Sequence, residues 1–143
     1  MRCLLDVNIL IALLDANHVF HGRVHDWLGA HKCGLASCAI TQNAAIRIMS
    51  QPRYSSLIAL TAAQVRQQLQ IGLGGQDHTY WACEPSLLDD KLFDWSHIHG
   101  PAQLTDIYLL GLALRHKACL VTLDRNISIN TVRGAKAQNL LVL

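Results

Sequence analysis

The sequence predicts an α/β fold, a three-layer α/β/α sandwich whose central parallel sheet has four to five strands. Short, continuously apolar segments alternate along the chain with longer segments in which apolar residues recur at helical spacing. Strands that are apolar on both faces are typical of a parallel sheet covered by helices on both sides. With 143 residues, 51% of them hydrophobic and 15% charged, the chain suits a single domain over residues 1–143.

Five apolar segments are the predicted strands. The first closes at Leu4 and Leu5, immediately before an aspartate. The others are residues 34–39, 79–83, 118–123 and 140–143. The third is rich in aromatic residues, and the last is expected at an edge of the sheet.

Helices are predicted between these strands. Their ranges are 9–14, 21–30, a segment opened by Thr41 and ended by Pro52, a segment running from Thr61 towards Gly72, and 104–116. Thr41 and Thr105 are the expected N-caps of the third and fifth helices, because a threonine hydroxyl can accept a hydrogen bond from the first turn. Residues 85–101 are expected to be loop with short helical pieces.

Composition and charge weaken several functional classes. The 12 Lys and Arg against 10 acids give a net charge of +2, which is too small to indicate nucleic-acid binding without a defined site. Five scattered cysteines without a C-x-x-C pair are typical of reduced thiols in a cytoplasmic protein. No apolar run is long enough to span a membrane, and no secretory signal is expected. The glycines of "GLGGQD" follow a helix and not a strand, which disfavours a phosphate-binding loop.

Three aspartates are expected to meet at one edge of the sheet. Asp6 and Asp124 follow two buried strands directly, and Asp106 falls in the first turn of the helix after residue 103. The carboxyl ends of parallel strands and the starts of the following helices share one crevice. Carboxylates about 5 Å apart repel by about 3 kcal/mol per pair at an effective dielectric of 20, so a cation is expected among them. Oxygen ligands favour Mg²⁺ or Mn²⁺ over zinc.

Each acid also has a structural interpretation that remains open at this point. Asp106 could complement the helix dipole, which is worth about 0.3 to 1 kcal/mol. Asp6 and Asp124 could be turn formers at the ends of their strands. The two helix starts "ITQN" and "LTDI" add a further hint, because each sets a polar side chain after a threonine. Gln42 therefore stands where a fourth acid would be expected.

The chain resembles a PIN-domain ribonuclease of the VapC toxin type. The likeness covers the whole sequence and is carried by "LLDVNILIALLD", "ASCAITQNAAIRIMSQPRY" and "LTDIYLLGLALRHKACLVTLDRN". The resemblance implies a single PIN-like domain and a metal-dependent endoribonuclease, the toxin of a type II toxin–antitoxin pair. It implies four catalytic positions, which here are Asp6, Gln42, Asp106 and Asp124. The three aspartates would hold one or two Mg²⁺ or Mn²⁺ ions, and an RNA substrate, a cognate antitoxin and a homodimer are implied as partners.

Gln42 departs from the pattern, because the family has a glutamate there. A neutral amide oxygen can still ligate a cation but lacks the charge, so we expect weaker metal binding and reduced activity. Glu84, the one glutamate in the chain, lies beyond a different strand and is a poor replacement. Either the protein is a naturally weakened nuclease, or Gln42 was introduced to disarm a toxin. The alternative function is a catalytically impaired PIN-fold binding module that holds an antitoxin or RNA.

Further residues have subsidiary expected roles. The residues expected to orient the ligands or water are Asn8, Asn43 and Thr122. The residues that could contact RNA phosphates are Arg47, Arg53 and Arg125, although a solvated helix face explains each equally well. A zinc site at His18, His21 and His25 is a competing hypothesis, since the last two are spaced i, i+4. An exposed helix face is the preferred interpretation of these histidines.

Overall fold

A five-stranded, entirely parallel sheet forms the centre of the computed structural model, which describes residues 1–143. Its strands are β1 (Cys3–Leu5), β2 (Leu35–Cys38), β3 (His78–Trp81), β4 (Cys119–Thr122) and β5 (Leu140–Val142). The spatial order is β3-β2-β1-β4-β5, which puts the three-residue β1 in the middle. The chain order therefore reverses at β1, and a crevice opens at the carboxyl end of the sheet at this point.

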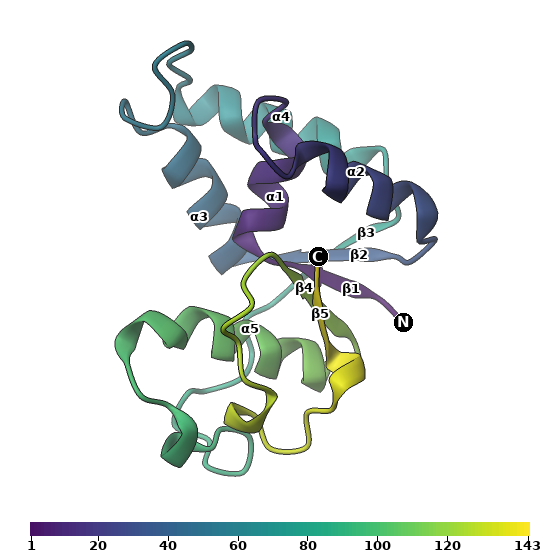
Figure 1. Ribbon diagram of the computed structural model, residues 1–143, viewed down its shortest axis with the longest axis vertical. Helices are drawn as coiled ribbons and strands as arrows, with labels where there is room; N and C mark the ends of the chain where they lie inside the picture. The colour runs from purple at the N-terminus through teal and green to yellow at the C-terminus, as the bar shows by residue number, and fades with distance from the viewer.

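Helices cover both faces of the sheet, as predicted. The principal helices are α1 (Val7–Leu14), α2 (His21–Ala30), α3 (Ala39–Met49), α4 (Ala62–Gly74) and α5 (Leu104–Arg115). Figure 1 shows α1 to α4 gathered on one side of the sheet and α5 on the other. The predicted three-layer α/β/α architecture is confirmed. No helix combines the length and the apolar character needed to cross a membrane.

Two separate hydrophobic cores lie on the two faces of the sheet. In β1, Cys3 and Leu5 join the core beneath α1 to α4, while Leu4 joins the core beneath α5. In β4, Val121 joins the core beneath α1 to α4, and Leu120 joins the core beneath α5. Successive side chains of a strand point to opposite faces, so a strand between two cores must be apolar throughout. The continuous apolar runs in the sequence have this origin.

Two predicted N-caps are wrong, and both errors concern how a helix begins. Helix α3 starts at Ala39 with Cys38 at the N-cap, because β2 runs into the helix without an intervening loop. Thr41 occupies the third helical position, where its hydroxyl accepts a hydrogen bond from the Cys38 N–H at 3.1 Å. Helix α5 begins at Leu104 directly after a 3₁₀ turn, so Thr105 already lies inside the helix. Helix α4 does begin after Thr61, where the sequence predicted a helix start, and the Thr61 hydroxyl caps it.

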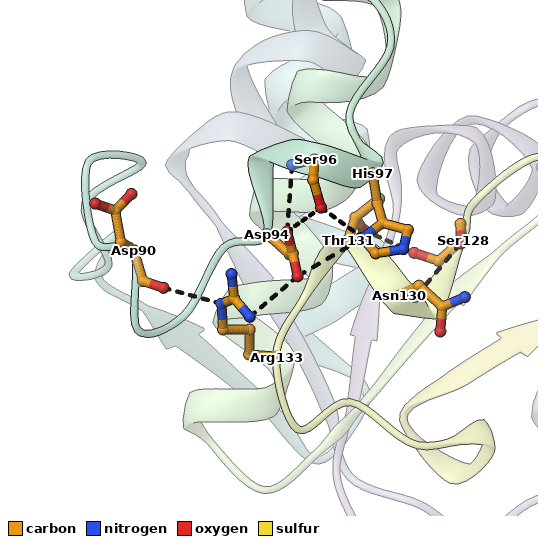
Figure 2. A network of polar contacts seen from close by, with 8 residues as sticks. All are labelled: Asp90, Asp94, Ser96, His97, Ser128, Asn130, Thr131 and Arg133. Carbon is orange, nitrogen blue, oxygen red and sulfur yellow. Dashed lines mark hydrogen bonds and ion pairs between the residues drawn. The ribbon is translucent and has the colours of Figure 1, made fainter.

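The segment from 85 to 101 is mostly loop, with a 3₁₀ turn at Trp95–His97 and the start of a second at Pro101. Figure 2 shows how it is tied to the loop after β4. An Asp94 carboxylate oxygen lies 3.0 Å from the Arg133 guanidinium, and the other oxygen accepts a 2.6 Å hydrogen bond from the Ser96 hydroxyl. The Ser96 hydroxyl and the charges of Arg133 and His97 hold the pKa of Asp94 below its usual value. These contacts join two loops next to the buried Phe93, which packs in the α5 core.

Candidate functional site

The crevice at the carboxyl end of the sheet contains the three aspartates singled out by sequence. Asp6 caps α1 directly after β1, Asp124 follows β4, and Asp106 lies in the first turn of α5. Asp106 and Asp124 line one pocket, together with Asn126 from the loop after β4. Burial raises the pKa of Asp6 and the charge of Asp124 adds to the rise, while burial raises the pKa of Asp106 and the charges of Asp6 and Asp124 add to it. The three acids, remote in the chain, therefore interact electrostatically in one site.

Asp6 is the most firmly held of the three. Its side chain is only 4% exposed. One carboxylate oxygen accepts a 2.6 Å hydrogen bond from the Val7 N–H, and the other accepts from the Thr122 hydroxyl at 2.6 Å and the Asn8 amide at 3.0 Å. Burial raises the pKa of Asp6, and these hydrogen bonds act in the opposite direction. The carboxylate is thus fixed in one orientation before any ligand arrives.

Thr122 and Asn8 join β1 to β4 beside this carboxylate. Thr122 Oγ1 accepts hydrogen bonds from the Asn8 amide at 3.1 Å and from the Asp124 N–H at 3.0 Å while it donates to Asp6. The Asn8 side-chain oxygen accepts from the Leu123 N–H at 3.0 Å. Both residues therefore hold the Asp6 carboxylate and the backbone next to Asp124 in place.

Replacing the fully buried Thr122 by valine should destabilise the protein by about 1 to 3 kcal/mol, because the buried Asp6 carboxylate and the Asp124 N–H each lose a hydrogen-bond partner. The pKa of Asp6 should rise further for the same reason. Urea denaturation at neutral pH measures the first effect, and an NMR titration of Asp6 measures the second. Thr122→Ser retains the hydroxyl and is the matched control. A valine variant as stable as the serine variant would show that the hydroxyl has no orienting role.

Asp124 and Asp106 differ in how much of their hydrogen-bonding capacity is used. One oxygen of Asp124 accepts from the backbone N–H and the side-chain amide of Asn126, at 2.8 and 2.9 Å, and the other has no hydrogen-bond partner. The half-buried Asp106 carboxylate makes no hydrogen bond or ion pair. Burial and the charges of Asp6 and Asp124 raise the pKa of Asp106 to about 6. Asp106 is thus the acid whose ionised form most lacks a partner.

No cationic side chain compensates the charge of the crevice. The three ion pairs of the molecule link Arg2 to Asp77 and Arg133 and His97 to Asp94, all away from this site. The donor set consists of oxygen atoms, which suits Mg²⁺ or Mn²⁺. No three acidic, histidine or cysteine side chains are grouped closely enough to ligate one ion directly. Because Mg²⁺ retains several waters and needs only one or two carboxylates, the acids present still fit such an ion.

The amide of Gln42 is hydrogen-bonded to a residue of β2. Its Nε2 donates a 2.9 Å hydrogen bond to the Ser37 hydroxyl, which lies 2.8 Å from Nε2 of His78. With its oxygen accepting from Gln42, Ser37 can donate its proton to a neutral His78. Burial and the nearby charge of Arg2 lower the pKa of His78, in keeping with that neutral form. The sequence did not indicate Ser37 or His78, and the only signal was a hydroxyl inside an otherwise apolar strand.

The other sequence-predicted residues lie at the surface. Asn43 is exposed and makes no side-chain hydrogen bond, so the structure does not place it with the acids. The three arginines proposed to contact phosphates are exposed and have no ion-pair partner: Arg47, Arg53 and Arg125. Among these, Arg125 directly follows Asp124 at the crevice. Glu84 is exposed beyond β3 and does not contribute to the pKa shifts of the three aspartates.

The histidines near α2 do not form a metal site. His21 Nδ1 lies 2.8 Å from the Ala12 carbonyl oxygen, and His25 Nε2 lies 3.2 Å from that of Leu13. His18 Nδ1 accepts a hydrogen bond from the Phe20 N–H at 3.2 Å. These ring nitrogens are engaged with the backbone, and no three metal-binding side chains gather here. The zinc hypothesis is therefore not supported. The rings of His21 and His25 instead form hydrogen bonds with carbonyl groups in the last turn of α1.

Comparison with known proteins adds full-length relatives. The chain matches no protein-family model. It is 46% identical over 144 residues to Ribonuclease VapC44 of Mycobacterium tuberculosis, with 100% of both chains covered. It is 34% identical to Ribonuclease VapC29 of the same organism, over 90% of each chain. Ribonuclease VapC38, also of that organism, is 36% identical over 87% of this chain and 86% of its own.

The chain belongs to the VapC family. The VapC fold is also seen in the crystal structure of Mycobacterium tuberculosis VapC20, described as a sarcin-ricin-loop-cleaving toxin. Its TM-score is 0.59 at 9% sequence identity, and the match covers 81% of this chain and 84% of that one. At that identity the likeness concerns the fold alone. It supports the PIN-like arrangement of the VapC sheet and helices.

Proposed function

We propose that this VapC-family chain is an endoribonuclease, the toxin of a type II toxin–antitoxin pair, and that its activity depends on Mg²⁺ or Mn²⁺ at Asp6, Asp106 and Asp124. The supporting observation is the site's uncompensated charge. Burial, together with the charges of Asp6 and Asp124, raises the pKa of Asp106 to about 6, and no cationic side chain forms an ion pair with any of the three acids. Selection would not be expected to retain such repulsion without a bound cation.

The three acids would have different tasks in this reaction. A bound divalent ion polarises a phosphate and lowers the pKa of an attacking water. Asp6, fixed by Thr122 and Asn8, sets the position of the cation. Asp124 offers the oxygen that Asn126 leaves free. Asp106 has no competing partner and can adjust its side chain to complete the site.

RNA and protein partners belong to the same proposal. Arg125 is exposed beside Asp124 and is the arginine best placed to meet an RNA phosphate near the crevice. A cognate antitoxin would bind this chain, which would form a homodimer as the family resemblance implies. The cytoplasm is the proposed location, because RNA substrates occur there and all five cysteines are free.

Gln42→Glu should increase cleavage at limiting Mg²⁺ by about tenfold. A carboxylate at this position would add charge to the crevice and could leave the Ser37 hydroxyl for the cation. Initial cleavage rates at several Mg²⁺ concentrations measure the gain. Gln68→Glu adds the same charge to α4 and is the matched control. An unchanged metal requirement would show that Gln42 is already equivalent to an acid or plays no part in metal binding.

The direct test is cleavage of a labelled structured RNA by the purified chain with Mn²⁺, with EDTA, and with EDTA followed by excess Mn²⁺. We expect cleavage in the first and third reactions alone. Activity that survives chelation would refute the metal-dependent mechanism. Binding of the RNA without cleavage under every condition would instead support the catalytically impaired binding module.

A further inference from the structure

Two cysteine sulfurs lie in unusually close contact at the end of the sheet remote from the acidic crevice. Cys3 begins β1, and Cys33 lies in the connection between α2 and β2. Their Sγ atoms are 2.9 Å apart, with the Cys3 thiol placed to donate to Cys33. The two residues are 30 positions apart in the chain, so this contact is tertiary.

Backbone contacts fix the chain around this thiol pair. The Cys3 N–H donates a 2.8 Å hydrogen bond to the Gly34 carbonyl, and Cys3 pairs in register with Leu35. These contacts hold the chain at Cys33 next to Cys3. A disulfide bond is about 2.05 Å long, so the sulfurs need to approach by about 0.9 Å more. Side-chain rotation and a small adjustment of the loop can supply that movement.

The two thiols differ in access. Cys3 is 7% exposed, while Cys33 is half-buried at the surface. A third cysteine, Cys119, pairs with Cys3 across β1 and β4 but is also buried. Burial raises the pKa of Cys119, and Cys33 adds to this effect. Cys33 is therefore the sulfur of this cluster that a solute can reach.

The contact with Cys33 also restrains the reactivity of Cys3. Burial raises the pKa of the Cys3 thiol strongly, and the hydrogen bond to Cys33 and the charge of Cys33 add to that rise. Once Cys33 carries a sulfur substituent, it can no longer become a neighbouring thiolate. Ionisation of Cys3 then becomes easier at the moment when a second thiolate is needed.

We propose that Cys3 and Cys33 form a redox-active pair that a low-molecular-weight disulfide, such as oxidised glutathione, converts to an intramolecular disulfide. The Cys33 thiolate attacks one sulfur of the small disulfide and releases one thiol. Cys3 then loses its proton to solvent and attacks Cys33 Sγ, which releases the second thiol. Two protein thiols are oxidised, and one small disulfide is reduced to two thiols.

Disulfide formation has a predicted physical consequence. The bond would close the segment from residue 3 to residue 33, which contains α1 and α2. Crosslinking a loop of this size restricts the unfolded chain. For a chain of this length the midpoint of thermal unfolding should rise by about 10 °C. A reducing agent should reverse the shift.

Oxidation of the folded full-length chain with excess oxidised glutathione, followed by acid trapping, free-thiol counting and peptide mapping, tests the proposal. We expect a crosslink between the Cys3 and Cys33 peptides, with two of the five thiols consumed by it. Cys83→Ser, which removes the exposed cysteine, should retain the crosslink and the thermal shift, whereas Cys33→Ser should lose both. Mapping of the unmutated chain decides the result even if Cys33→Ser folds poorly. Glutathione found on Cys83 alone, or a crosslink that joins Cys33 to Cys119, would overturn the proposal.

Discussion

Asp106→Asn is expected to reduce metal-dependent RNA cleavage by at least about 10³-fold and, at the same time, to make the metal-free protein more stable. Asparagine has nearly the same shape as aspartate but removes the charge that the proposed cation needs. It also removes the repulsion from Asp6 and Asp124, which contributes to raising the pKa of Asp106 to about 6. Loss of activity together with a gain in stability separates a functional carboxylate from a structural one.

The gain in stability should depend on pH in a defined way. A rise in pKa from 3.8 to about 6 corresponds to about 3 kcal/mol of unfavourable charge in the folded state. Solvent screening of the half-buried group, and the lost interaction with the N-terminus of α5, leave a net gain of about 1 kcal/mol for the variant at pH 7. Because Asp106 in the parent is protonated below pH 3.8 in both states, the difference should appear only as the pH rises from 3.8 through about 6.

Thermal unfolding at a series of pH values, with and without Mn²⁺, measures the change in stability, and the cleavage assay measures the loss of activity. The parent should gain stability from Mn²⁺, and Asp106→Asn should gain much less. Asp26→Asn is the matched control, because Asp26 is an exposed acid on α2. A variant that cleaves RNA within a few-fold of the parent rate would remove Asp106 from the site.

Gly111→Ala should destabilise the fold by about 2 kcal/mol, although alanine is the better helix former. A Cβ atom at position 111 of α5 would lie 2.7 Å from two ring carbons of Phe93. Phe93 is 1% exposed and lies in the core beneath α5, so its ring has little room to move. The steric cost therefore exceeds the gain of up to about 1 kcal/mol from helix propensity.

Urea denaturation of three variants gives the test. Gly29→Ala in α2 is the matched control, since a Cβ there meets no atom within 4 Å. It should leave stability unchanged or raise it slightly. Phe93→Leu combined with Gly111→Ala should cost less than the sum of the two single changes, because the smaller side chain relieves the overlap. Additive losses would show that the ring is not the obstacle.

The layers of the fold were predictable because the central strands β1 and β4 each face two cores. The spacing of apolar residues in a segment indicates whether one or both of its faces are buried. The strands before Asp6 and Asp124 are apolar on both faces of the sheet. The helix starts at Thr41 and Thr105 were mispredicted because capping preferences describe isolated helix ends. Here the last residue of a strand, Cys38, or of a 3₁₀ turn, Gln103, occupies the N-cap position, so each threonine lies inside its helix.

The surroundings of Gln42 could not be predicted from local sequence. Its hydrogen-bond partner Ser37 lies on β2, and Ser37 in turn meets His78 at the start of β3. Which residues of β2 and β3 are neighbours depends on the register of two strands joined by two helices. The position of Gln42 after a strand indicated at which end of the sheet it lies. The direction of its side chain, however, depends on how β2 and β3 are paired.

The central position of β1 between β2 and β4 determines when the acidic crevice can exist during protein synthesis. Asp6 precedes its hydroxyl partner Thr122 by 116 residues, so the two are synthesised at different times. A growing chain that lacks β4 has no crevice, because β1 has only one of its two flanking strands. Whatever chemistry this site performs is therefore withheld until β4 has been made and has paired with β1.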